Sequence, residues 1–354
     1  SETVLFHPTW EARSAHEAQG EAQFDRHEVL VCALPELELV ALSQALPDAH
    51  CNALAGVHPH DAAGHYLQAA QQLLAKVQAL FKDGSRLRIL LQLVVPAEGP
   101  LALLGGLGAL LKTAHLEHPR FIGQLIAVAP GMSAAKLAED LRADSRRPHE
   151  RHIRHDLGGR HVAAWAEIDT HASRRPWRPG GVYLITGGAG GLGHILASEI
   201  AATTPQATVV LAGRSALGVE AKAWLHDAQA QGAGLRYCAL DVSDPEAVQA
   251  LVDEIVERHG GLHGIVHAAG VLDDSLLVRK GAEQLRAVFA PKVAGLVHLD
   301  RASRRSNASS ASAPWWACRA TSDKPTTPQP TPSWTPSPSN AAPSCNRNSA
   351  RVAR

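Results

Sequence analysis

The sequence predicts an α/β fold built from two doubly wound parallel sheets and followed by a disordered tail. Apolar, strand-like runs alternate with helical patterns through the first half of the chain. A second unit opens where the apolar run 182–186 passes through a glycine-rich turn into a helical pattern. Beyond Arg301, leucine, isoleucine, phenylalanine and glycine vanish, and serine, proline, threonine, alanine and arginine dominate. Such a composition cannot bury a core.

The bulk composition narrows the classes of partner. The chain has 354 residues and a formal net charge of +0, which indicates neither nucleic acid nor an acidic membrane as a broad partner. No leader peptide is visible, and a first residue other than Met indicates a piece of a longer polypeptide. The longest apolar run, 100–111, is too short to span a membrane. The five cysteines show no paired spacing, which predicts a reducing, cytoplasmic compartment and a protein without structural zinc. They are Cys32, Cys51, Cys238, Cys318 and Cys345.

The first half of the chain reads as a nucleotide-type fold that lacks a nucleotide site. No strand-like run here leads directly into a glycine fingerprint. The glycine-rich stretch 105–108 lies inside a helical pattern, which favours helix packing over phosphate binding. The expected strands are 28–34, 87–95 and 121–128, and the expected helices are 62–80 and 101–114.

Two histidine-rich stretches raise the question of a metal site. His149, His152 and His155 are evenly spaced, but no carboxylate or cysteine set completes a ligand group. The simpler interpretation is that 146–156 forms an exposed, solvated face leading to a short strand at 161–165. His58-Pro59-His60-Asp61 is similarly interpreted as a turn, with Asp61 as the N-cap of the next helix.

A polar connector rich in proline and glycine, 172–181, is the best candidate boundary, and the glycine loop follows it. Glycines at a strand-to-helix turn let the backbone approach a pyrophosphate, and the free N–H groups and the helix dipole favour its charge. The predicted phosphate-binding residues are Thr186, Gly187, Gly188, Ala189, Gly190, Gly191, Leu192 and Gly193.

The next strand, 208–212, ends in Gly213-Arg214-Ser215. An acid at this position would bind the ribose 2′-hydroxyl of NAD, whereas a cation and a hydroxyl suit a 2′-phosphate. The sequence therefore predicts NADPH rather than NADH, with a surface arginine that merely ends a strand as the alternative.

Two further strands complete the expected cofactor site. The strand 235–240 is closed by Asp241-Val242, and Ser243-Asp244-Pro245-Glu246 begins a helix. The strand 264–267 ends at His267 and is closed by Ala268-Ala269-Gly270, whose small side chains would let a nicotinamide ribose lie near the backbone.

These motifs, in this order and with Pro291-Lys292-Val293 after them, resemble the short-chain dehydrogenase/reductases. They resemble most closely the ketoreductase domain of modular polyketide synthases. The resemblance covers the chain to about residue 300. It implies a structural, Rossmann-like subdomain without cofactor at 1–171, the linker at 172–181, and an incomplete Rossmann-like, NADPH-binding catalytic subdomain at 182–302.

The resemblance implies reduction of a 3-oxoacyl thioester by NADPH within a multidomain synthase. The substrate would be tethered through phosphopantetheine to an acyl carrier protein. In the family a tyrosine acts as the acid, a serine orients the carbonyl, a lysine lowers the tyrosine pKa and binds the ribose, and an asparagine completes the set. Lys292 matches the lysine, with an exposed helix lysine as the alternative.

Leu272-Asp273-Asp274 resembles the marker of B-type ketoreductases, whose products are R-configured 3-hydroxyacyl chains. The resemblance implies that Asp274 lines the substrate entrance. The alternative is that these acids only cap the next helix.

The chain departs from the family after Lys292. The expected serine, tyrosine and asparagine are absent, because the three tyrosines, Tyr66, Tyr183 and Tyr237, all precede Lys292. Codons for 326–337, shifted by one nucleotide, permit D-Y-A-A-A-N-A-F-L-D-A-F, the missing segment. We therefore expect 303–354 to be an out-of-frame tail, with a genuine proline- and serine-rich linker as the alternative. Three interpretations therefore stay open: an active reductase, an inactive fragment that binds NADPH, and a purely structural module of a synthase.

Overall fold

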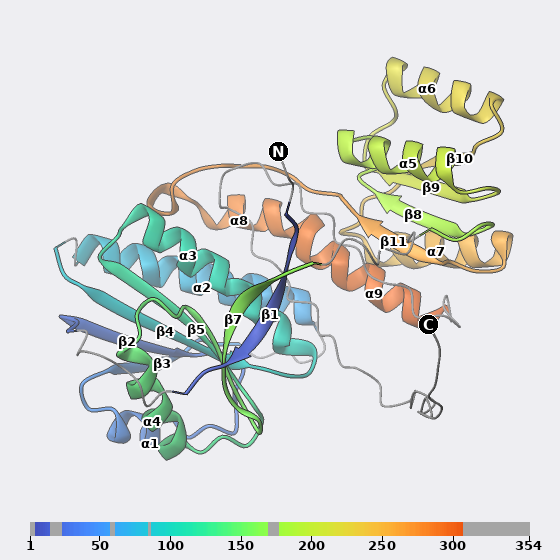
Figure 1. Cartoon of the computed structure of the whole chain (residues 1–354). Coiled ribbons are helices and arrows are strands. Elements are labelled where there is room, and N and C mark those ends of the chain that lie inside the picture. The colour runs from blue at the N-terminus through green and yellow to red at the C-terminus, as the bar shows by residue number, and fades with distance from the viewer. Residues whose placement is uncertain (1–3, 15–22, 57–60, 84–85, 169–176, 307–354) are drawn as a thin grey trace, which may run out of the picture.

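The computed structural model describes residues 4–14, 23–56, 61–83, 86–168 and 177–306. Within these residues the chain forms two separate sheets, one of seven strands and one of four. Figure 1 shows each sheet with its own helices, and a helical segment, α8 and α9, that runs from one sheet to the other. The predicted α/β class is confirmed.

The first sheet has the order β1-β7-β6-β5-β4-β2-β3. Strands β3, β2, β4, β5 and β6 run parallel to one another. Strand β7 pairs antiparallel with β6 and with the edge strand β1, so β7 alone runs against the other strands of this sheet. The strands are β1 (Phe6–Ala12), β2 (Arg26–Val31), β3 (His50–Ala53), β4 (Ile89–Pro96), β5 (Phe121–Val128), β6 (His152–Asp156) and β7 (Gly159–Glu167).

Helices cover both faces of this sheet, as its continuous apolar strands require. One core joins α2, η2 and α3 to β4 and β5, and a second joins α1 and α4 to the opposite face. The helices are α1 (Leu39–Ala45), α2 (Ala62–Asp83), η2 (Pro100–Leu107), α3 (Gly108–Glu117) and α4 (Ala134–Ser145). Asp61 caps α2 as predicted, because its Oδ1 accepts the N–H of Gly64 at 2.9 Å. The glycine-rich stretch 105–108 is helical, also as predicted, and its residues 105–107 are buried.

The expectation of an exposed face at 146–156 is wrong. Strand β6 lies here, and Glu150 and His155 are buried. The polar groups can be buried because they satisfy one another. His155 Nε2 lies 2.8 Å from Asp144 Oδ2, and Arg160, which also contacts Glu150, donates to Asp144 Oδ1 at 2.7 Å. His152 instead packs edge-on against Trp10.

The second sheet is entirely parallel and has the order β10-β9-β8-β11. Counted along the chain within this sheet, that order is 3-2-1-4, which places a topological switch point between β8 and β11. The strands are β8 (Val182–Thr186), β9 (Thr208–Gly213), β10 (Gly234–Ala239) and β11 (Gly264–His267). The helices are α5 (Gly191–Thr203), α6 (Val219–Ala230), α7 (Pro245–His259), η4 (Leu277–Arg279), α8 (Ala282–Phe289), η5 (Ala290–Ala294) and α9 (Gly295–Arg305). Asp244 caps α7 as predicted.

The segment η4–α8 belongs in packing terms to the first half of the chain (Figure 1). Leu277, Leu285, Val288 and Phe289 are buried in the core formed by α2, α3, β4 and β5. The amide of Gln78 donates to the carbonyls of Leu277 and Lys280 at 2.7 and 2.9 Å. The carboxylate of Glu117 accepts the N–H of Leu277 at 3.0 and 2.9 Å.

Helix α9 ends at Arg305, past the expected boundary at 302. The prediction of a disordered, out-of-frame tail otherwise concerns 307–354, which lie outside the described residues. Among the described helices, none has the length and apolar character that a membrane span requires.

Candidate cofactor and substrate site

The glycine loop is shaped by close backbone packing. Gly187 has a φ of +71°, and a Cβ built on it would lie 2.6 Å from the carbonyl carbon of Ala268. A Cβ on Gly193 would lie 2.6 Å from the Cα of Gly188. Only glycine fits these two positions, because L side chains rarely adopt the first conformation and the second would collide with backbone.

Gly191 has a different environment, since a Cβ there would meet nothing within 4 Å. It is the first residue of α5, whose N-cap, Gly190, makes no side-chain capping hydrogen bond. Among the described residues no hydrogen bond engages the N–H groups of 191–193, which lie at the positive end of the helix dipole. This is the arrangement that binds a pyrophosphate.

A pocket with about 410 Å³ of empty space lies at the carboxyl ends of all four strands of the second sheet. Ligands of open α/β sheets bind at this edge, beside the switch point. Six predicted residues line the pocket, namely Gly187, Gly213, Arg214, Val242, Ala269 and Gly270. Leu240, Val271 and Pro291 also line it and were missed. The available signal was their place in the sequence: Leu240 precedes Asp241, Val271 lies between two predicted motifs, and Pro291 belongs to the motif that carries Lys292.

Arg214 is exposed at the end of β9. Among the described residues no hydrogen bond or ion pair engages its guanidinium. Asp241, which follows β10, is held by two bonds from Ser243, whose hydroxyl donates at 2.6 Å and whose N–H donates at 2.9 Å. These bonds, and secondarily the charge of Arg214, hold the pKa of Asp241 below its usual range. Arg214 is thus left available for an anion.

Thr186 and His267 lie close in the sequence to residues of this pocket but do not line it. The Thr186 hydroxyl is 2.7 Å from His267 Nδ1, and His267 Nε2 is 2.9 Å from the carbonyl oxygen of Pro291. Burial lowers the pKa of His267, which favours the neutral ring. Nε2–H then donates to Pro291, and Nδ1 accepts from Thr186. His267 thereby ties the glycine loop to the turn that carries Lys292.

Lys292 lies in η5, a π-helical turn beginning at Ala290. π-turns of this kind occur frequently at functional sites. The Cε of Lys292 is 3.1 Å from where a Cβ on Gly270 would lie, so the side chain lies against the small-residue segment that follows β11. The pKa of Lys292 lies below its usual value, mainly because the side chain is partly buried. The charge of Asp274 opposes this shift, and the charge of Lys280 adds to it.

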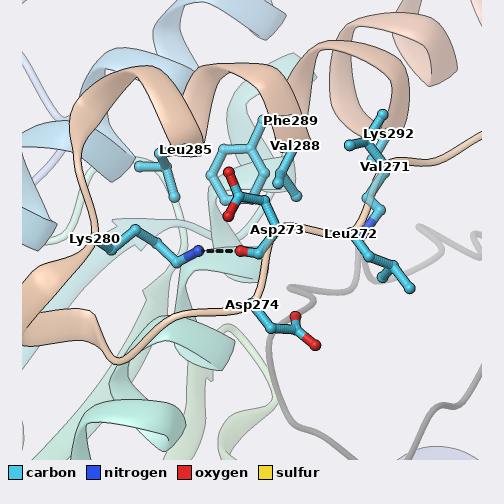
Figure 2. A pocket seen from close by; sticks show the side chains of 9 residues that line it. All are labelled: Val271, Leu272, Asp273, Asp274, Lys280, Leu285, Val288, Phe289 and Lys292. Carbon is cyan, nitrogen blue, oxygen red and sulfur yellow. Dashed lines mark hydrogen bonds between the residues drawn. The ribbon is translucent and has the colours of Figure 1, made fainter.

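A second pocket, shown in Figure 2, adjoins the first through Val271. It has about 290 Å³ of empty space. Its polar wall consists of Asp273, Asp274, Lys280 and Lys292, and its apolar wall consists of Val271, Leu272, Leu285, Val288 and Phe289. The predicted entrance residues and Lys292 are therefore brought together.

The alternative that Asp273 and Asp274 cap the next helix is wrong, because η4 and α8 have Leu276 and Gly281 as N-caps. The Lys280 ammonium instead donates to the carbonyl of Asp273 at 2.7 Å, as Figure 2 shows. Gln284 donates to Asp273 Oδ1 at 3.0 Å. No group of three or more histidine, cysteine or acidic residues in the described ranges is placed to hold a metal ion.

Comparison with known proteins assigns the family. The KR domain profile matches residues 181–311. Polyketide synthase PksN of Bacillus subtilis (strain 168) is 38% identical over 306 residues, or 86% of this chain and 6% of that protein. Polyketide synthase PksL of the same strain is 40% identical over 307 residues, or 86% of this chain and 7% of that protein. The crystal structure of a ketoreductase domain from the bacillaene assembly line matches with a TM-score of 0.75 and 34% identity, covering 85% of this chain and 70% of that chain. This chain belongs to the ketoreductase domains of polyketide synthases.

Ketoreductase domains are oxidoreductases of the short-chain dehydrogenase/reductase superfamily, whose members bind NAD(P)H. The glycine loop, the open N-terminus of α5 and the adjoining pocket of this ketoreductase domain fit such a dinucleotide. The chain spans only 6% and 7% of the lengths of the two synthases.

The ketoreductase domain brings no tyrosine to either pocket. Tyr66 is buried against Phe289, with ring centroids 5.4 Å apart. The Tyr183 hydroxyl accepts the N–H of Arg178 at 2.7 Å. The Tyr237 hydroxyl donates to the carbonyl oxygen of Ser215 at 2.5 Å. Because the full sequence contains three tyrosines, no phenol of this chain reaches the pockets.

Proposed function

We propose that this chain binds NADPH in the pocket at the carboxyl edge of its second sheet. The observation that carries the proposal is that Arg214, exposed and without a hydrogen-bonding partner among the described residues, lines this pocket at the end of β9. A guanidinium in that position matches a ribose 2′-phosphate, where an acid would select the 2′-hydroxyl of NADH.

Each motif contributes one part of the binding site. The backbone of 187–193 binds the pyrophosphate, and Arg214 with Ser215 binds the 2′-phosphate. Residues 268–270 and Lys292 border the nicotinamide ribose. NADPH supplies a hydride when bound. The proposed domain division is 1–171 as the structural subdomain, 172–181 as the linker and 182–302 as the cofactor subdomain.

The reaction that we propose for the family from which this chain derives is reduction of a 3-oxoacyl thioester on an acyl carrier protein to an R-configured 3-hydroxyacyl thioester. Leu272, Asp273 and Asp274 would face the tethered chain at the second pocket, which is supported by their place in its wall. The family acid is a tyrosine, and no tyrosine lines either pocket. We therefore propose that the chain as written binds the cofactor without turning over substrate.

Two titrations and one assay test these proposals. Fluorescence titration of the full chain should show tighter binding of NADPH than of NADH. Equal affinities would contradict the role of Arg214, and binding of neither cofactor would support a purely structural module. Incubation with NADPH and a 3-oxoacyl thioester should give no 3-hydroxyacyl product, and appreciable turnover would refute the missing-acid argument. A chain with the reading frame of the tail restored should then reduce the thioester.

A further inference from the structure

The loop between β9 and α6 carries Arg214 and Ser215, and few bonds hold it. The N–H of Leu240 donates to the carbonyl of Gly213 just before the loop, and the N–H of Lys222 donates to Gly218 just after it. Across 214–217, the one hydrogen bond among the described residues is the 2.5 Å bond from the Tyr237 hydroxyl to the carbonyl oxygen of Ser215. Tyr237 is therefore the tether of this loop.

Tyr237 reaches the loop from the neighbouring strand. It lies on β10 opposite Leu211 of β9, and its ring packs at the margin of the core under α5 and α6. The phenol passes over Gly213, where a Cβ would lie 2.7 Å from the hydroxyl oxygen. Gly213 thus leaves room for the tether, which gives this glycine a role distinct from approach to a phosphate.

We infer that Tyr237 is a specificity-determining residue that positions Arg214 and Ser215 for the 2′-phosphate of the cofactor. The inference rests on the proposed function. Ordering a loose loop on binding would cost conformational entropy, and the tether removes part of that cost before the ligand arrives. Its effect should be confined to the phosphate that distinguishes NADPH from NADH.

The test uses the full chain with Tyr237→Phe, which keeps the ring and deletes the hydroxyl. Affinities for NADPH and NADH are measured by fluorescence titration, and those for 2′,5′-ADP and 5′-AMP by competition. We expect about five- to tenfold weaker binding of NADPH and 2′,5′-ADP, the contribution of one hydrogen bond, with NADH and 5′-AMP unchanged. Tyr183→Phe is the matched control, because it also deletes a hydroxyl bonded to backbone, but on β8 outside both pockets.

A second variant checks the mechanism. Gly213→Ala places a Cβ on the phenol oxygen and should produce the same selective loss in the wild-type background. In the Tyr237→Phe background it should add little, because the tether is already gone. An equal loss for both cofactors, no loss in Tyr237→Phe, or full additivity of the two substitutions would overturn the inference. A wild-type chain without preference for NADPH would overturn the proposed function, and this inference with it.

Discussion

Gly191→Ala should separate the stability of the glycine loop from its binding role. The added methyl meets nothing within 4 Å, and Gly191 is the first residue of α5. Replacing glycine by alanine at a compatible position stabilises a protein by about 0.4–1 kcal/mol, because the unfolded chain loses freedom. The free energy of unfolding should therefore rise by that amount.

The same methyl should weaken cofactor binding, because it occupies the space in front of the α5 N-terminus. Losing one or two charge-assisted hydrogen bonds to the pyrophosphate costs about 1.5–3 kcal/mol, or roughly ten- to a hundredfold in the dissociation constant. Stability would be followed by urea unfolding and binding by NADPH fluorescence. A variant that is more stable and also binds NADPH as tightly as the wild type would refute the assignment of the loop.

Two glycine substitutions serve as controls. Gly193→Ala places its Cβ 2.6 Å from the Cα of Gly188, so it should lower both stability, by about 1–3 kcal/mol, and binding. Gly261→Ala meets only His263 at 3.6 Å and precedes β11, at the edge of the sheet opposite the pocket. It should leave NADPH affinity unchanged.

Three further predictions concern groups outside the loop. Gln78→Ala removes two hydrogen bonds to η4, so unfolding should cost about 1–3 kcal/mol less and amide exchange in 277–289 should accelerate. Asp274→Asn removes the charge that raises the pKa of Lys292, so that pKa should fall further, measured as the pH profile of amine acylation with exposed Lys222 as reference. Burial lowers the pKa of His152 to about 4, against an ordinary value of 6.5. The unfolded chain binds that proton more readily, so stability should be full above pH 6.5 and fall by about 3 kcal/mol by pH 4, less so in His152→Phe.

The strands that sequence predicted best are those buried on both faces. Strands β5 and β11 have the expected bounds, because strands covered by helices on both sides read as continuous apolar runs. Strand β6 was missed for the converse reason. Its buried His155 is bonded to Asp144 of α4, which also accepts from Arg160 of β7, and that pairing cannot be seen until the chain is folded.

The candidate site was predictable where function depends on backbone shape and not where it depends on distant contacts. The glycines at 187 and 193 predict a tight turn from residue type alone. Lys280 gave no comparable signal, since its place in the pocket wall depends on Gln78, which binds the Lys280 carbonyl from the other half of the chain. The tether from Tyr237 to Ser215 was invisible for the same reason.

The second pocket shows why the half of the chain without a cofactor loop matters to the site. Leu285, Val288 and Phe289 line that pocket and also belong to the core built by α2, α3, β4 and β5. Glu117 and Gln78 fix η4, so the N-terminal half sets the position of Lys280, and through α8 that of η5 with Lys292. The second sheet positions the glycine loop and Arg214 by itself. Cofactor recognition can therefore reside in the second half alone, whereas the pocket beside Lys292 requires both halves to be packed together.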